Sequence, residues 1–239
     1  MAEVNDLPRP RAWRIPVAAI GLAVLAAGLF EGTTAAAQVS RGVDFGAGPP
    51  STTANHFAQW VTASGDNHGL PFVVVDKAQA RVLVFYPDGR LRGAAPALLG
   101  LARGDDTVPG IGQRKLASIK PRERTTPAGR FIADLGADLG VNDVLWVDYD
   151  SAISLHRVVT TQPKERRLQR LATPTAGDNR ISYGCINVPA QFYDGVVQPT
   201  FTGTSGVVYI LPEIRSLASV FPAFGAMAAA VLPPATSPR

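Results

Sequence analysis

The stretch FVVVDKAQARVLVFYPDGRL, residues 72–91, decides the fold class of this chain. It contains two runs rich in β-branched and aromatic residues, Phe72–Val75 and Arg81–Tyr86. A Pro-Asp-Gly turn at 87–89 then leads into a third run from Arg90. Short runs of this composition, separated by turn residues, are typical of antiparallel strands. The stretch therefore predicts a β-meander.

Strand signals return further along the chain, after a Gly-rich segment at 94–124. They lie at Gly129–Ile132, Val144–Val147, Ala152–Val159 and Gly206–Leu211. A loop as long as 94–124 in a compact domain is usually functional or disordered. Since this region lacks the 3.6-residue period of a long helix, we expect a mainly β fold. A sandwich or open barrel with long loops and short helices fits this pattern.

The composition is that of one globular domain with flanking segments. The 239 residues are 46% hydrophobic and 18% charged. The net charge of +4 arises without the dense basic runs of a nucleic-acid binder, so no nucleic-acid partner is predicted.

The first 37 residues have the pattern of an export signal. Three arginines precede the apolar run Ile15–Phe30, and Ala35 and Ala37 supply the small-x-small pattern that a signal peptidase requires. We interpret 1–37 as a signal peptide cut after Ala37. The alternative is an uncleaved anchor, which would be the only membrane contact, although a span usually needs about 20 apolar residues. The expected location is the periplasm or cell wall.

The rest of the chain divides into three parts. Residues 38–70, rich in Gly, Ser, Thr, Asn and Pro, predict a flexible linker with one helical turn around His56–Val61. Residues 71–212 carry the strand signals and form the predicted domain. The apolar tail 213–239 is expected to dock a helix on the surface, since its longest apolar piece, Ala223–Leu232, is too short to span a bilayer.

The only cysteine, Cys185, lies in the segment RISYGCINVP at 180–189. A solitary cysteine in an exported protein is buried and inert, paired with another chain, or chemically active. Gly184 before it and a β-type run after it put the sulfur at a turn that enters a strand. Gly184 permits close backbone approach, and the amides of Tyr183, Gly184 and Cys185 are predicted to form an oxyanion hole. We favour a nucleophile over the usual buried, inert cysteine.

A thiol nucleophile needs a base, and His156 is the best candidate. It lies in the strand-like run ISLHRVV, where packing can hold an imidazole in place. The alternative is a core histidine bonded to a backbone carbonyl. His56 and His68 fall in the predicted linker and, with Asp66, lack metal-ligand spacing, so no metal is predicted.

These motifs resemble the L,D-transpeptidase catalytic domain, also called the YkuD domain. The similar segments are SYGCIN at 182–187 with its upstream histidine, TTPAGRF at 125–131 and the hairpin VDKAQARVLVFYPDG at 75–89. Together they cover about residues 71–211. The resemblance implies a YkuD-type β-sandwich or open barrel for 71–212, with Cys185 as nucleophile and His156 as base. It further implies that the backbone carbonyl of Arg157 orients the imidazole.

The resemblance also implies substrate contacts near the nucleophile. Ser182 and Asn187 match polar positions of the family motif. Arg180 lies just ahead of the motif and is a candidate for a substrate carboxylate, although no family position corresponds to it. Tyr183 stands where familiar members have a second histidine, and it is either a substrate contact or a packing residue.

The spacer between His156 and Cys185 is longer than in the family pattern, which places an insertion at 161–180. The part at 164–170 is predicted to form a short basic helix, either a lid over the site or a solvated surface helix. Five basic and two acidic residues give the region 164–180 a charge of 5 − 2 = +3, which suits carboxylate-bearing peptides.

The resemblance implies an acyl-transferase acting on peptidoglycan stem peptides through a Cys185 thioester, with no cofactor. The amine acceptor is another stem peptide, a lipoprotein lysine or a D-amino acid. One alternative is a carboxypeptidase or crosslink hydrolase with the same Cys185–His156 pair, in which water is the acceptor. A second alternative is a non-catalytic cell-wall binding module.

Overall fold

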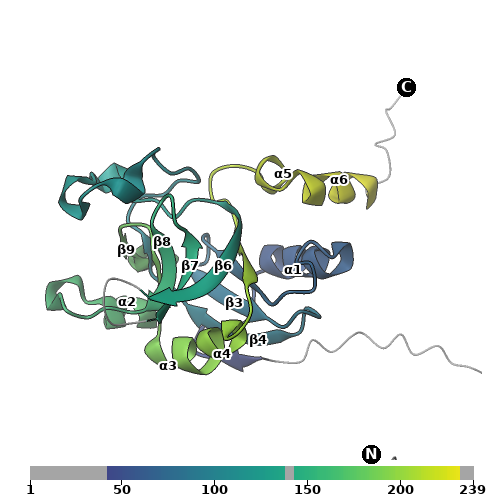
Figure 1. Cartoon of the computed structure of the whole chain (residues 1–239), viewed down its shortest axis with the longest axis horizontal. Helices are drawn as coiled ribbons and strands as arrows, with labels where there is room; N and C mark the ends of the chain where they lie inside the picture. Colours follow the sequence, from purple (N-terminus) through teal and green to yellow (C-terminus); the bar gives the residue numbers. More distant parts are fainter. Residues whose placement is uncertain (1–41, 138–142, 232–239) are drawn as a thin grey trace, which may run out of the picture. The chain divides into compact units, whose positions relative to one another are not determined.

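The computed structural model describes residues 42–137 and 143–231 (Figure 1). Nine of the described strands form one curled sheet in the order β1-β4-β3-β2-β11-β6-β7-β8-β10, and β5 pairs with β9 separately. The strands are β1 (Val43–Asp44), β2 (Phe72–Asp76), β3 (Arg81–Phe85), β4 (Leu91–Pro96), β5 (Leu99–Gly100), β6 (Gly129–Ala137), β7 (Asp143–Asp148), β8 (Ile153–Arg157), β9 (Arg180–Ser182), β10 (Ile186–Val188) and β11 (Gly206–Ile210). The predicted mainly β fold is confirmed.

The meander predicted at 72–91 forms the first half of the sheet. β2 pairs antiparallel with β3, and β3 with β4. β11 then enters beside β2, parallel to it and antiparallel to β6. The second half, β6-β7-β8-β10, ends with β10 parallel to β8. That parallel pair brings the segments of Cys185 and His156 to one end of the sheet.

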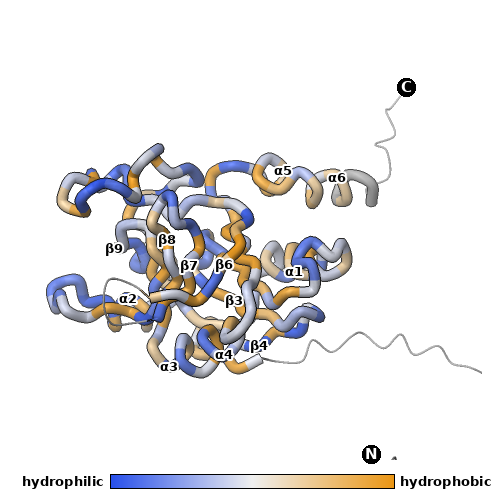
Figure 2. Tube along the Cα trace, viewed as in Figure 1, coloured by the Kyte–Doolittle hydropathy of each residue, from blue (hydrophilic) through white to orange (hydrophobic). Residues whose placement is uncertain are grey.

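Alternating side chains give the sheet two apolar faces. One face is covered by α3 (Ala190–Phe192), a π-helical turn at 193–197 and α4 (Gln198–Phe201). The opposite face of β2, β3 and β11 is covered by α1 (Thr52–Ser64) and the tail helices α5 (Leu217–Val220) and α6 (Pro222–Val231). Figure 2 shows hydrophobic colours in the central strands and hydrophilic ones in the segment that leads to α2 (Arg167–Ala172). The candidate site lies at β8 and β10, at the edge of the sheet.

The predicted linker 38–70 is corrected by the structure, because β1 and α1 both lie within it. The helix α1 has Ser51 as its N-cap, whose hydroxyl accepts the Ala54 amide at 3.0 Å. It ends at Gly65 in a left-handed conformation. Phe57 and Val61, four residues apart, are fully buried against the sheet. The apolar residues that predicted a single helical turn form the buried stripe of a 13-residue helix with a cap at each end.

The tail helices pack on α1 through aromatic rings. The ring centroids of Phe221 and Phe224 lie 4.7 Å and 5.4 Å from that of Phe57. In the two described ranges, no helix combines the length and apolar character that crossing a bilayer requires. The predicted signal peptide at 1–37 lies outside the described residues.

Candidate active site

Residues 183–185 form a tight turn between β9 and β10, and Cys185 stands at its end. Gly184 has φ of +139°, which other residues rarely adopt. A Cβ at this position would lie 2.7 Å from both the carbonyl oxygen of Thr125 and Cδ1 of Ile153. The turn therefore requires glycine, and it presents the sulfur where the chain enters a strand.

The register of β8 and β10 brings the predicted base to the nucleophile. Ile186 is opposite Leu155, so Cys185 lies alongside Ser154, and His156 is two residues further on the same face. The imidazole of His156 hydrogen-bonds the Cys185 thiol. The Ser154 hydroxyl lies 3.7 Å from the sulfur, and the Ala152 carbonyl oxygen lies 3.5 Å from it. As a whole residue, Cys185 is half-buried.

The tautomer of His156 follows from its second contact. Nδ1 lies 2.7 Å from the carbonyl oxygen of Arg157. Because a carbonyl oxygen can only accept, Nδ1 carries the proton and donates it. Nε2 is then the atom that can take a proton from the Cys185 thiol. The implied orienting role of the Arg157 carbonyl corresponds to this contact.

The surroundings of Cys185 shift its acidity in opposite directions. Burial raises the pKa of the thiol, whereas the hydrogen bond and charge of His156 and the amide and hydroxyl of Ser154 lower it. The lowering contributions together outweigh burial, so the pKa of Cys185 lies below its ordinary value. The site therefore favours the thiolate, which is the nucleophilic form.

Of the three amides predicted to form the oxyanion hole, one already has a partner within the chain. The Gly184 amide donates to the Ser182 hydroxyl at 3.1 Å, which removes it from the site. The Thr126 hydroxyl donates to the Gly184 carbonyl at 2.8 Å. In a trans peptide the C=O and the following N–H point in opposite directions, so this bond aims the Cys185 amide away from Thr126. The described residues offer the Cys185 amide no hydrogen-bond partner, and the Tyr183 amide is the second candidate donor.

Ser182, Asn187 and Arg180 are buried and make hydrogen bonds within the chain around the turn, and their predicted contact with a substrate stays a prediction. Only 2%, 1% and 9% of these residues are exposed. The Ser182 hydroxyl donates to the Cys185 carbonyl at 2.6 Å, and the Asn187 amide donates to the same oxygen at 3.3 Å. Arg180 pairs with Glu213 at 2.7 Å and donates to the Lys77 carbonyl at 2.7 Å.

Arg180 belongs to a buried ion cluster that the sequence did not reveal, formed with Lys77, Asp105 and Glu213. Lys77 donates to Asp105 at 2.7 Å and to the Thr126 carbonyl at 2.9 Å. Burial lowers the pKa of Lys77 despite Asp105. Burial also raises the pKa of Asp105, but the bonds from Lys77 and the amides of 213–215 lower it more, to about 2. Through Lys77, the cluster holds the backbone carbonyl of Thr126, whose hydroxyl bonds the turn that carries Cys185.

The side chain of Tyr183 is partly exposed and pairs with a cation. The guanidinium carbon of Arg124 lies 3.9 Å from the centre of the Tyr183 ring, within the range of a cation–π contact. Arg124 belongs to the loop before β6, so this contact joins that loop to the turn that carries Cys185. Nothing in the spacing of Arg124 and Tyr183, 59 positions apart, signals their contact.

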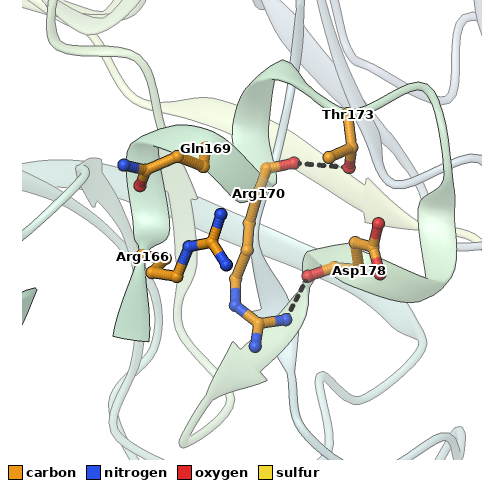
Figure 3. Close-up of a pocket in the computed structure, with 5 residues that line it drawn as sticks. All are labelled: Arg166, Gln169, Arg170, Thr173 and Asp178. Carbon is orange, nitrogen blue, oxygen red and sulfur yellow. Dashed lines mark hydrogen bonds between the residues drawn. The ribbon is translucent and has the colours of Figure 1, made fainter. Parts of the chain in front are cut away.

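The insertion at 161–180 folds onto the nucleophile strand. Its helix α2 starts at Arg167 and not at 164, because a 3-10 turn at 163–165 and Arg166, with φ of +52°, precede it. Arg167 donates to the Asn187 side-chain oxygen at 2.7 Å. Arg170 donates to the Asp178 carbonyl, beside a cavity of about 200 Å³ (Figure 3). Arg167 therefore attaches the insertion to β10, whereas Arg170 holds the insertion together internally.

A second cavity opens beside His156, the candidate general base. It has a volume of about 340 Å³ and is lined by His156, Arg157 and neighbours on β7, β8 and α3. His156 is thus one of the residues that a small molecule in this cavity would contact. Across the described ranges, no three metal-ligating side chains gather closely enough to hold an ion.

No protein-family model matches the chain, and no curated protein matches it. Solved structures are similar to parts of it, among them the catalytic domain of the E. faecium L,D-transpeptidase, with 16% identity over 59% of this chain and 96% of that domain at a TM-score of 0.38. The LD transpeptidase LdtMt1 in complex with imipenem is similar at 14% identity and a TM-score of 0.34, over 59% of this chain and 58% of that one.

The helical cell shape determining protein Pgp2 from Campylobacter jejuni is also similar. Its identity is 14% over 67% of this chain and 57% of that one, with a TM-score of 0.41. This chain thus spans somewhat more than half the length of LdtMt1 and of Pgp2. The similar structures include L,D-transpeptidase catalytic domains, the family that the sequence resembles. At these identities and scores the case for function rests on the site itself.

Proposed function

We propose that the protein is a cysteine acyl-transferase of the L,D-transpeptidase type that acts on peptidoglycan stem peptides. The observation that carries the proposal is the chain of contacts from the Cys185 thiol to His156 and on to the Arg157 carbonyl. A nucleophile, a base with a defined tautomer and a group that orients the base are the parts that acyl transfer needs. Cys185 is half-buried rather than sealed in the core, and the cavity at the neighbouring His156 offers substrates a route to the pair.

In the first step, the sulfur of Cys185 attacks the carbonyl at the L-centre of the diamino acid in a tetrapeptide stem. The carbon–sulfur bond forms as His156 Nε2 takes the thiol proton, and the amides of Cys185 and Tyr183 bind the oxyanion. The carbon–nitrogen bond to the terminal D-residue then breaks. His156 returns the proton to the leaving amine, which leaves a thioester.

In the second step, an amine acceptor attacks the thioester. The acceptor is another stem peptide, a lipoprotein lysine or a D-amino acid. His156 takes the proton of the amine and passes it to the departing sulfur, so the thiol is regenerated and a new amide remains. We place the reaction outside the cytoplasm, in the periplasm or cell wall, because the pattern at 1–37 is that of an export signal.

Incubation with defined muropeptides tests the proposal, with products measured by mass. The wild type is expected to form dimers or acceptor-modified stems and to release the terminal D-residue, and Cys185→Ala is expected to form neither. Stems shorter by one residue, without dimers or modified stems at high acceptor concentration, would establish the hydrolase instead. A protein that binds peptidoglycan while Cys185 resists a carbapenem and produces no turnover would be the binding module.

A further inference from the structure

Two aromatic rings stack on the surface beside the nucleophile. Trp146 of β7 and Tyr149, from the turn after β7, have ring centroids 4.9 Å apart and planes 22° apart. Tyr149 is 66% exposed. The rings extend over Gly136 of β6, where a Cβ would lie 2.8 Å from Trp146 Cδ1. Glycine at 136 leaves room for the stack, which we term the aromatic platform (Trp146 and Tyr149).

The aromatic platform lies on the same face of the sheet as the nucleophile. Trp146 is directly opposite Ser154 in the antiparallel β7–β8 pair, so both side chains point to one face. The Ser154 hydroxyl in turn lies 3.7 Å from the Cys185 sulfur. The turn that carries Tyr149 also carries Ala152, whose carbonyl is the second neighbour of the sulfur at 3.5 Å. The platform and the nucleophile therefore form one continuous surface.

The chemistry of the platform fits a sugar ring. The negative face of an aromatic ring attracts the C–H groups on the flat side of a pyranose, as it attracts other positively polarised edges. Asp134 of β6 stands directly opposite Trp146, on the same face, and its carboxylate is exposed. It already accepts the Ser205 hydroxyl, and its remaining lone pairs can accept sugar hydroxyls. A carboxylate at the rim disfavours an anionic occupant and suits a hydroxyl-rich one.

We propose that the aromatic platform binds the sugar that carries the stem peptide, an inference that rests on the proposed function. Trp146 lies two strands from the turn of Cys185, about 10 Å at the usual spacing of neighbouring strands. Three extended residues span up to about 10 Å, so a stem peptide joined to a sugar on the platform is long enough to bring the carbonyl of its third residue to the turn of Cys185. A sugar seated on Trp146 and Tyr149 thus delivers that carbonyl to the sulfur.

The test compares two donors, a tetrapeptide stem with its disaccharide and the same peptide without sugar. The wild-type full chain is expected to have the higher kcat/KM for the sugar-bearing donor. Trp146→Ala is expected to lower the ratio of the two values by about tenfold, and Tyr149→Phe to retain most of it because the stack persists. Leu168→Ala, an exposed apolar residue of α2, is the control that keeps the ratio. Equal turnover of both donors by the wild type, or a ratio unchanged in Trp146→Ala, overturns the platform.

A binding measurement separates this inference from the proposed function. Cys185→Ala is titrated calorimetrically with the methylamide of the disaccharide N-acetylglucosaminyl-N-acetylmuramic acid, which has neither a peptide to react nor a free carboxylate. Binding that is lost in Cys185→Ala combined with Trp146→Ala supports the platform even if the wild type turns over neither donor, in which case only the proposed function fails. Absence of binding in Cys185→Ala, or binding that survives Trp146→Ala, overturns the platform. Circular dichroism of each variant verifies the fold.

Discussion

The hydroxyl of Thr126 donates to the carbonyl oxygen of Gly184 at 2.8 Å and accepts the amide of Gly100 at 2.9 Å. Thr126 is 1% exposed and cannot touch a substrate. Its effect on chemistry is therefore indirect. By holding the Gly184 carbonyl it fixes the peptide plane whose other end is the Cys185 amide, the donor proposed for the oxyanion. Thr126 is a positioning residue in this sense.

Replacing Thr126 by valine is expected to lower kcat by roughly tenfold to a hundredfold, because a misaimed oxyanion donor loses part of the transition-state stabilisation that it provides. Stability is also expected to fall by about 1–3 kcal/mol, since the buried Gly184 carbonyl and Gly100 amide lose a partner. Steady-state kinetics and urea unfolding measure the two effects.

Thr126→Ser is the matched control, since it keeps the hydroxyl and is expected to retain most of the kcat. Alkylation of Cys185 by iodoacetamide should keep its pH midpoint in Thr126→Val, because the contacts of the sulfur with His156 and Ser154 are not altered. A valine variant that folds normally and retains full kcat would show that the oxyanion is not bound by the Cys185 amide.

The second prediction concerns the pH dependence of Cys185. Because His156 and Ser154 lower the pKa of the thiol more than burial raises it, the thiolate is expected to persist to lower pH than in a free cysteine, whose pKa is about 8.5. The rate of iodoacetamide alkylation, plotted against pH, is expected to have its midpoint below that of a free cysteine measured under the same conditions. In His156→Ala the burial contribution remains, so the midpoint is expected to rise. A midpoint that is the same in both proteins contradicts the contact between imidazole and sulfur.

Gly184→Ala is the third prediction. The added Cβ would stand 2.7 Å from the Thr125 carbonyl, in a backbone conformation that alanine avoids. Strain of this kind costs on the order of 1–3 kcal/mol before the clash is counted, and the turn that presents the sulfur must shift. Loss of stability in urea and loss of activity are both expected. Gly195→Ala is the control, because a Cβ at Gly195 meets nothing within 4 Å, and wild-type behaviour of Gly184→Ala would refute the requirement for glycine.

The strands and the turn at Cys185 were predictable from sequence because their signals are local. The run Phe72–Val75 and the turn at 87–89 specify neighbouring strands without reference to distant residues. Gly184 before the cysteine indicates a bend in the same way. Ser154 was also within reach, since strand alternation places it on the same face as His156.

The ion pair of Arg180 could not be predicted from local sequence signals. Its position next to the motif suggested a substrate carboxylate, but its partner Glu213 lies 33 residues away, and only the fold decides which carboxylate an arginine meets. The helix at 52–64 was missed for a different reason. Its polar caps and exposed positions resemble linker composition, and the buried stripe gains its stability from the sheet it covers.

The last prediction tests the buried ion cluster through acid stability. The pKa of Asp105 is lowered in the folded state to about 2, from the ordinary value of 3.8. A carboxyl with a depressed folded pKa stabilises the fold fully above its unfolded pKa, and this stabilisation is lost as pH falls toward the folded pKa. The affected window is therefore about pH 4 to 2, and the loss is on the order of 2 kcal/mol.

Asp105→Asn leaves the ammonium of Lys77 buried without its nearest carboxylate, so we expect a loss of a few kcal/mol at pH 7. Because the variant has no carboxyl to protonate at 105, its deficit relative to wild type should shrink as pH falls from 4 to 2. Urea unfolding at several pH values measures this convergence. Asp106→Asn, which removes an exposed neighbouring carboxylate, controls for net charge. Since the same cluster holds the Thr126 backbone, Asp105→Asn should also lower kcat at pH 7, and parallel stability curves with unchanged kcat would separate the ion cluster from the nucleophile turn.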